Sequence, residues 1–208
     1  MSTVALIVIA KEPLPGRAKT RLTPPCTPAE AATLAEAALL DTLEVVESTP
    51  AARKVLAFDG DPRRFQRAGL EVIPQRGAGL AERLAAAFED VGGPALLVGM
   101  DTPQLTPSLL SDAMRALAAP AVDAVLGPAD DGGYWSIGLK HDAGPALAGI
   151  PMSCPSTCAA QRARLHKLGL RVQGQPRLRD IDTIEDARAV ASDAGGTRFA
   201  AALGAIAA

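Results

Sequence analysis

The sequence has few aromatic residues and almost no net charge, and each scarcity excludes something. Aromatic residues make up 3% of the 208 residues, so the core must be packed mainly with Leu, Val, Ile and Ala. The formal net charge of −2 gives no general attraction to nucleic acid or to an anionic membrane, and a nucleic-acid partner is not expected. An anionic ligand must therefore be held by a local cluster of cations.

Cysteine and histidine are also scarce. Three cysteines, Cys26, Cys154 and Cys158, are too few and odd in number for a disulfide framework. Cys154 and Cys158 lie four residues apart and His166 follows, so a metal site is one interpretation; we favour reduced thiols in a cytosolic protein. With only His141 and His166 present, histidine acid–base chemistry is not expected. A Gly-x-Ser-x-Gly nucleophile elbow is absent as well.

Long hydrophobic runs are missing. The apolar run from Val4 to Ala10 is far too short to span a bilayer, and no basic residues precede it as they would in a secretory signal. We therefore expect no membrane span and a cytoplasmic protein. A buried strand of a parallel sheet explains the continuous apolarity of this run.

Apolar, β-rich runs alternate with helical patterns along the whole chain. This alternation predicts right-handed crossovers and a mostly parallel sheet between two layers of helices. The expected strands are 4–10, 54–58, 70–74, 95–99, 121–127, 134–139 and 170–174. The expected helices are 28–48, 63–68, 79–91, 107–117, 155–168, one from Ile184 onward, and 197–207.

Strands 121–127 and 134–139 are expected to form an antiparallel hairpin excursion from this sheet. No repeat or linker divides the chain, so we expect a single domain over residues 1–208. The Ala-rich stretch 197–207 suits either a homodimer surface or a helix that faces the core, and the core-facing helix is the simpler interpretation.

A basic loop follows the first expected strand. Ligands of open α/β sheets bind beyond the carboxyl ends of the strands, so this position favours a phosphate site over a merely solvated loop. Its prolines and glycine fix an irregular backbone that can aim N–H groups and cations at an anion. It has neither the Walker A nor the G-x-G-x-x-G spacing. The candidate phosphate-binding residues are Lys11, Gly16, Arg17, Lys19, Thr20 and Arg21.

Two acidic residues are candidate metal ligands. Asp101 follows the buried strand 95–99 and is held by Pro103, and carboxylates in such places suit Mg²⁺, although a turn cap would also explain this acid. Asp182 stands directly before a helix whose capping already accounts for Thr183 and Asp186. We expect Asp101 and Asp182 to face each other as ligands of Mg²⁺ (or Mn²⁺).

A third segment holds the only tyrosine and the only tryptophan of the chain. Its Gly-Gly pair lets backbone approach a ligand closely, and a tight hairpin needs the same pair. The aromatic pair suits a stacking surface for a base or sugar, and core packing explains it equally well. The candidate substrate-binding residues are Asp131, Gly132, Gly133, Tyr134 and Trp135.

Four segments in this order resemble the DUF2064 family of bacterial proteins, usually labelled glycosyltransferase. They are the Lys-x-Pro-x-Pro-Gly-x-x-Lys-Thr-Arg-Leu opening at 11–22, Gly-x-Asp-x-Pro at 99–103, Asp-Gly-Gly-Tyr at 131–134 and Asp-x-Asp-Thr at 180–183. The resemblance extends from Val4 to about Asp186. It implies a three-layer α/β/α GT-A fold, that of the nucleotide-diphospho-sugar transferases, near the molybdenum-cofactor and 2-phospholactate guanylyltransferases.

The resemblance also implies roles for individual residues. Lys11, Arg17, Lys19 and Arg21 would contact phosphates, and Asp101 would bind magnesium with Asp182 as a second carboxylate. The chain departs from the GT-A pattern in having no Asp-x-Asp at Asp101. It departs from the family in reading Cys-Pro-Ser-Thr at 154–157, where Trp-Ser-Thr is common.

The function expected from these features is a metal-dependent transferase with a nucleotide donor. Lys19, Arg21 and Asp101 would act in catalysis through electrostatics and positioning, without a protein nucleophile. A nucleotide-sugar donor with glycosyl transfer to a small-molecule acceptor is the first alternative. Nucleotidyl transfer from a nucleoside triphosphate, with release of pyrophosphate, is the second. A non-catalytic nucleotide-binding protein on the same fold is the third.

Overall fold

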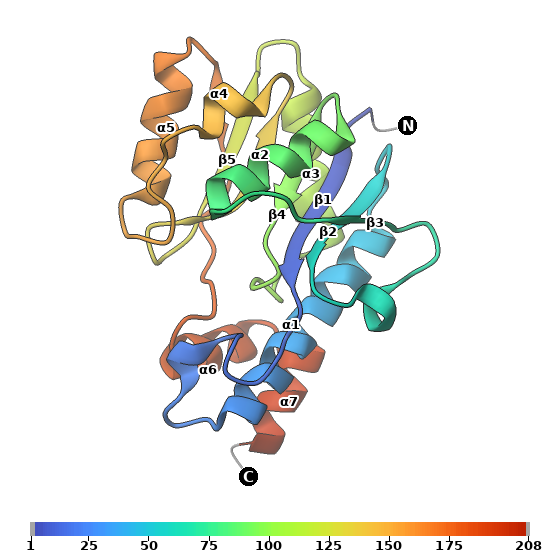
Figure 1. Ribbon diagram of the computed structural model, residues 1–208, viewed down its shortest axis with the longest axis vertical. Coiled ribbons are helices and arrows are strands. Elements are labelled where there is room, and N and C mark those ends of the chain that lie inside the picture. Colours follow the sequence, from blue (N-terminus) through green and yellow to red (C-terminus); the bar gives the residue numbers. More distant parts are fainter. Residues whose placement is uncertain (1–2, 207–208) are drawn as a thin grey trace.

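The computed structural model describes residues 3–206, which form a seven-stranded sheet with helices on both faces (Figure 1). The strands lie in the order β3-β2-β1-β4-β6-β5-β7, and β6 alone runs antiparallel to its neighbours. This confirms the mostly parallel sheet and the hairpin excursion. The strands are β1 (Ala5–Lys11), β2 (Lys54–Asp59), β3 (Glu71–Pro74), β4 (Ala95–Val98), β5 (Ala124–Pro128), β6 (Tyr134–Leu139) and β7 (Val172–Gly174).

Helices cover the two faces of the sheet in separate groups. The helices are α1 (Pro28–Ser48), α2 (Leu80–Val91), α3 (Pro107–Ala118), α4 (Ala143–Leu147), α5 (Thr157–Lys167), α6 (Ile184–Asp193) and α7 (Arg198–Ile206). Side chains of α1 and α3 form one core cluster with one face of the sheet. Side chains of α2, α4 and α5 form a second cluster with the other face.

A third core cluster lies beyond the sheet, between α1, α6 and α7. Figure 1 shows α6 and α7 beside α1, next to the loop that follows β1. Leu22 from that loop and Ile181 from the segment before α6 are both fully buried in this cluster. The cluster therefore fixes the basic loop against the late acidic segment, although the two are far apart in the sequence.

The C-terminal helix packs on α1, as expected for a core-facing helix. Phe199 and Leu203 of α7 are buried in the third cluster. The expected helix 197–207 extends past residue 206 and its last residue lies outside the described part, as do residues 1, 2 and 208 of the expected domain. Within residues 3–206, no helix is both long and apolar enough to cross a membrane.

Local capping signals located the long helices well. The Thr27 hydroxyl accepts a hydrogen bond from the main-chain N–H of Glu30, and the Glu30 carboxylate accepts one from the N–H of Thr27, so the capping box forms as expected. The same reciprocal pair links Thr183 and Asp186 at the start of α6. Helix capping therefore explains both Thr183 and Asp186, as the sequence indicated.

Several short elements differ from expectation. The expected helix 63–68 is a 3-10 turn over Pro62–Phe65, and the expected strand 121–127 begins only at Ala124, because the chain still turns where the Val122 N–H donates to the Ala119 carbonyl. Two elements were not expected: α4, and a 3-10 turn at Thr20–Leu22. Helix α4 was not predicted because it contains Gly144 and Pro145, which are poor helix formers. Its start is capped by the Asp142 carboxylate, which accepts a hydrogen bond from the Gly144 N–H.

Candidate functional site

The carboxyl edge of the sheet carries a cavity of about 670 Å³. Its walls come from segments far apart in the sequence: the ends of β1 and β4, the hairpin between β5 and β6, the stretch before α5, and the segment before α6. Parallel strands bring their carboxyl ends to one edge, and the antiparallel β6 contributes its start there. Most of the segments singled out from the sequence therefore meet.

A smaller cavity of about 180 Å³ opens beside the larger one. Five residues border both: Lys11, Arg21, Met100, Asp101 and Asp182. Lys19 and Thr20 border the smaller cavity only. Three cations of the basic loop and the two acids predicted as metal ligands thus border one space, which is large enough for phosphate groups.

Lys19 occupies a special position in the basic loop. Its backbone is left-handed, with φ 49° and ψ 40°, which is uncommon for a residue other than glycine. Its ammonium nitrogen lies 2.9 Å from Asp101 Oδ2 and donates to the main-chain carbonyl of Ile181. The Lys19 side chain is only 8% exposed. One buried ammonium therefore joins the loop after β1, the end of β4 and the segment before α6.

Other residues of the basic loop lie in different surroundings. Arg21 forms an ion pair with Asp182, and its side chain is 67% exposed. Gly16 and Arg17 are exposed in a turn where the Arg17 N–H donates to the Leu14 carbonyl, and neither is among the residues that border the two cavities. Their predicted contact with phosphate therefore requires a ligand that reaches out of the cavities.

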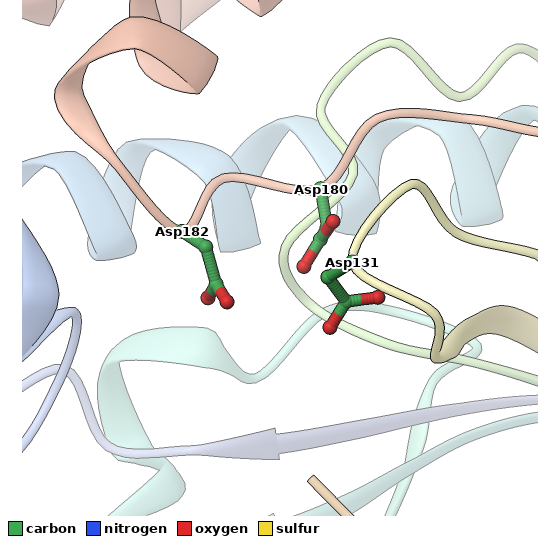
Figure 2. Close-up of side chains that lie close together, drawn as sticks. All are labelled: Asp131, Asp180 and Asp182. Carbon is green, nitrogen blue, oxygen red and sulfur yellow. The ribbon is translucent and has the colours of Figure 1, made fainter. Parts of the chain in front are cut away.

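Three carboxylates gather at the edge of the cavity. Oxygen atoms of Asp131, Asp180 and Asp182 all lie within 4.8 Å of one another. Figure 2 shows them where the Asp180–Asp182 segment passes the hairpin that carries Asp131. Burial, followed by repulsion from Asp131 and Asp182, raises the pKa of Asp180 to about 6. Like charges held this close favour either a shared proton or a bound cation.

The donor set fits a hard divalent ion. Mg²⁺ and Mn²⁺ prefer carboxylate oxygens, and these three carboxylates offer a clustered set from two segments. Asp182 was predicted as a metal ligand, whereas Asp131 was predicted to bind substrate. Asp101, the other predicted ligand, lies outside this group and pairs with Lys19.

Sequence reasoning missed Asp180, although a signal was present. In an extended segment, residues two apart point to the same side, so Asp180 and Asp182 share a side while Ile181 faces the other way. Ile181 is fully buried in the third core cluster, which turns the two acids toward the cavity. The Asp-x-Asp pattern sought at Asp101 occurs here instead.

The hairpin between β5 and β6 is held tightly in place. Gly132 has φ +88°, and the Gly133 N–H donates to Asp131 Oδ1 at 2.7 Å, which orients that carboxylate. Tyr134 and Trp135 both border the cavity. Trp135 is only 3% exposed and its indole N–H donates to the Pro176 carbonyl, so core packing accounts for most of this side chain.

The cysteines are free thiols in the structure. Hydrogen bonds from the Ser156 and Thr157 side chains lower the pKa of Cys154, which borders the cavity, whereas burial raises the pKa of Cys158. Within residues 3–206, the carboxylate group is the one set of three candidate ligands that lie close together. Cys154, Cys158 and His166 do not form another.

Comparison with known proteins shows which family and which solved structures this chain resembles. A family model described as "Uncharacterized protein conserved in bacteria (DUF2064)" matches residues 42–154, just over half of the chain. No match was found among curated proteins. A crystal structure from Desulfovibrio desulfuricans G20, provisionally named a nucleotide-diphospho-sugar transferase, has a TM-score of 0.80 and 28% identity, over 89% of this chain and 85% of that one.

More distant structures share the fold. A nucleotidyl transferase from Methanothermobacter has a TM-score of 0.64 and 14% identity, over 90% of this chain and 96% of that one. The mannosyltransferase PcManGT from Pyrobaculum calidifontis, in complex with GDP-Man and Mn²⁺, has a TM-score of 0.55 and 15% identity, over 88% of this chain and 56% of that one. The fold is that of the nucleotide-diphospho-sugar transferases, as the resemblance implied.

Proposed function

This chain belongs to the DUF2064 family, and from that premise we propose that it is a metal-dependent transferase that uses a nucleotide donor. The observation that carries the proposal is the meeting of three cations and a group of carboxylates at the carboxyl edge of one sheet. A phosphorylated ligand needs the cations, and a divalent ion needs the carboxylates. A site that holds both suits a ligand whose phosphates are bridged by metal.

The cations and the carboxylates of the site have different roles in this proposal. Lys11, Lys19 and Arg21 would bind donor phosphates and offset the charge of the leaving group. Asp131, Asp180 and Asp182 would hold the divalent ion, which supplies further charge neutralisation at the phosphates when bound. No side chain has to attack the donor, so catalysis rests on orientation and electrostatics.

We favour a nucleotide sugar as the donor and glycosyl transfer as the reaction. The structure from Desulfovibrio desulfuricans supports this choice by its provisional name, at 28% identity over most of both chains. The cavity of about 670 Å³ has room for a sugar nucleotide beside the carboxylates. Sugar and small-molecule acceptor would then lie near the hairpin wall, which includes Gly133 and Tyr134.

A specific observation favours a second candidate, nucleotidyl transfer. The smaller cavity lies directly beside the larger one and is bordered by Lys11, Lys19 and Arg21. A nucleoside triphosphate could place its terminal phosphates there, and these would leave as pyrophosphate. The two reactions therefore differ in what fills the smaller cavity.

A donor screen tests the proposal. The protein is first heated with each common nucleoside triphosphate, diphosphate and nucleotide sugar, with and without MgCl₂ or MnCl₂, because a bound ligand raises the melting temperature. Donors that stabilise it are then incubated with metal, and released nucleoside diphosphate or pyrophosphate is measured. Nucleoside diphosphate released from a nucleotide sugar supports glycosyl transfer, and pyrophosphate released from a nucleoside triphosphate supports nucleotidyl transfer. If no nucleotide stabilises the protein at saturating concentration with either metal, the proposal fails.

A further inference from the structure

Two carboxylates of the site are paired with cations of the basic loop. Asp101 pairs with Lys19, and Asp182 pairs with Arg21. Each pair joins a residue predicted to bind metal to a residue predicted to bind phosphate. In the structure, each of these two predicted metal ligands is therefore neutralised by a predicted phosphate ligand.

The two pairs differ in how firmly they are held. Arg21 is 67% exposed, so water can replace its partner and the pair contributes little to the stability of the site. The Lys19 side chain is 8% exposed and also donates to the carbonyl oxygen of Ile181, and its charge acts on Asp180 as well. A buried ammonium that loses its carboxylate without gaining another anion is costly. Asp101 is 43% exposed and can turn toward the cavity while Lys19 stays fixed.

This arrangement penalises either ligand when it binds alone. A divalent ion that takes Asp101 would leave the Lys19 ammonium without its ion-pair partner, beside the positive charges of Lys11 and Arg21. A phosphate that takes Lys19 would leave the Asp101 carboxylate unpaired beside new negative charge. When metal and phosphate arrive together, each partner of the broken pair gains an opposite charge, and the penalty disappears.

We propose that the Lys19–Asp101 pair makes this site selective for a metal–nucleotide complex over free metal or free nucleotide. On binding, Lys19 exchanges Asp101 for a donor phosphate, and Asp101, which borders the same cavity as Asp131, Asp180 and Asp182, turns to join them as a further ligand of the metal. The inference rests on the proposed function and deepens it by naming the form in which the donor binds. Lys19 is then a phosphate-binding residue that also sets the coupling between the two ligands.

Removing the ammonium separates this role from simple phosphate binding. In Lys19→Met, Asp101 is free in the absence of ligand, so Mn²⁺ alone should bind about tenfold more tightly than to the wild type, a typical size for a coupling between two ligands. A nucleoside diphosphate chosen from the donor screen should bind more weakly. Isothermal titration calorimetry with MnCl₂ alone, with the diphosphate alone and with both measures these affinities, after subtraction of metal binding to the diphosphate in solution.

Lys54→Met is the matched control. Lys54 also donates to a main-chain carbonyl, that of Glu47, but it begins β2 at the opposite edge of the sheet. The Lys54→Met variant should bind Mn²⁺ as the wild type does. If circular dichroism shows that Lys19→Met does not fold, Lys19→Gln, which keeps a donor for Ile181, gives the same readout.

The outcomes distinguish a failure of the Lys19–Asp101 exchange from a failure of the proposed function. If Mn²⁺ alone binds the Lys19 variant no more tightly than the wild type, while the wild type still binds metal and diphosphate together, the exchange is refuted and the proposed function stands. If the wild type binds neither ligand in any combination, both the exchange and the proposed function are refuted. A rise in metal affinity confined to the Lys19 variant supports the exchange.

Discussion

The carbonyl oxygen of Pro155 occupies the place where a side chain on Gly132 would lie. A Cβ added to Gly132 would come within 2.1 Å of that oxygen, and the Gly132 carbonyl in turn accepts a hydrogen bond of 2.8 Å from the N–H of Cys158. The hairpin is thus docked, backbone against backbone, on the start of α5. This contact sets where Asp131 stands in the carboxylate group.

We expect Gly132→Ala to destabilise the protein by about 2 to 4 kcal/mol, since it combines backbone strain at positive φ with overlap against main-chain atoms. Urea unfolding monitored by circular dichroism measures the loss. Gly69→Ala is the control, because Gly69 has φ +74° but nothing within 4 Å of an added Cβ. It should lose only the strain, about 1 kcal/mol. Equal losses for both variants would show that the close contact with Pro155 carries no energy.

A buried carboxylate attaches the C-terminal helix to α1. Asp41 is 6% exposed, and its two oxygens accept the main-chain N–H groups of Arg198 and Phe199 at 2.9 and 2.8 Å. Hydrogen bonds to a charged group are worth about 1.5 to 3 kcal/mol, so Asp41→Ala should lower the free energy of unfolding by about 2 to 3 kcal/mol. Asp112→Ala, which removes an exposed pair with Arg115, should change it by about 0.5 kcal/mol or less. Chemical denaturation of both variants decides the point, and a similar small effect for Asp41 would contradict it.

Patterns local in the sequence were sufficient for most of the fold. Continuous apolar runs marked the buried strands, and capping residues such as Thr27 and Thr183 fixed where α1 and α6 begin. Short elements escaped because tertiary contacts decide them. The five-residue helix α4 contains Gly144 and Pro145, and its buried residues pack in the second core cluster, which no local pattern reveals.

The candidate site was predictable as a region and less so as a set of contacts. Strand ends placed Lys11 and Asp101 at one edge correctly. The pairing of Lys19 with Asp101 depends on the third core cluster, which holds the basic loop against the segment containing Ile181. That cluster joins residues more than 150 positions apart, so the partner of each charge could not be derived from spacing.

The raised pKa of Asp180 gives the metal-free protein a distinct pH dependence. Because the folded pKa of about 6 lies above the ordinary value of 3.8, the folded state binds more protons between these limits. The contribution of Asp180 to stability should therefore be most favourable below pH 4, decrease as the pH rises toward 6, and stay constant above it. In EDTA, Asp180→Asn should be more stable than the wild type at pH 7.5, with a smaller difference at pH 4.5. Denaturation curves at both pH values test this, and a difference that does not change with pH would contradict it.

Two adjacent acids allow a matched test of the carboxylate group. Asp131 belongs to the group, whereas Asp130 pairs with Arg179 and lies outside it. Asp131→Asn removes one of three clustered charges and should weaken Mn²⁺ binding by about tenfold or more, since metal affinity depends on the number of charged ligands. Asp130→Asn changes the net charge equally, so a purely long-range electrostatic effect would weaken both alike. We expect calorimetric titration with MnCl₂ in the presence of a nucleoside diphosphate to show the loss for Asp131→Asn and near wild-type binding for Asp130→Asn. Equal affinities for the two variants would mean that Asp131 does not contact the ion.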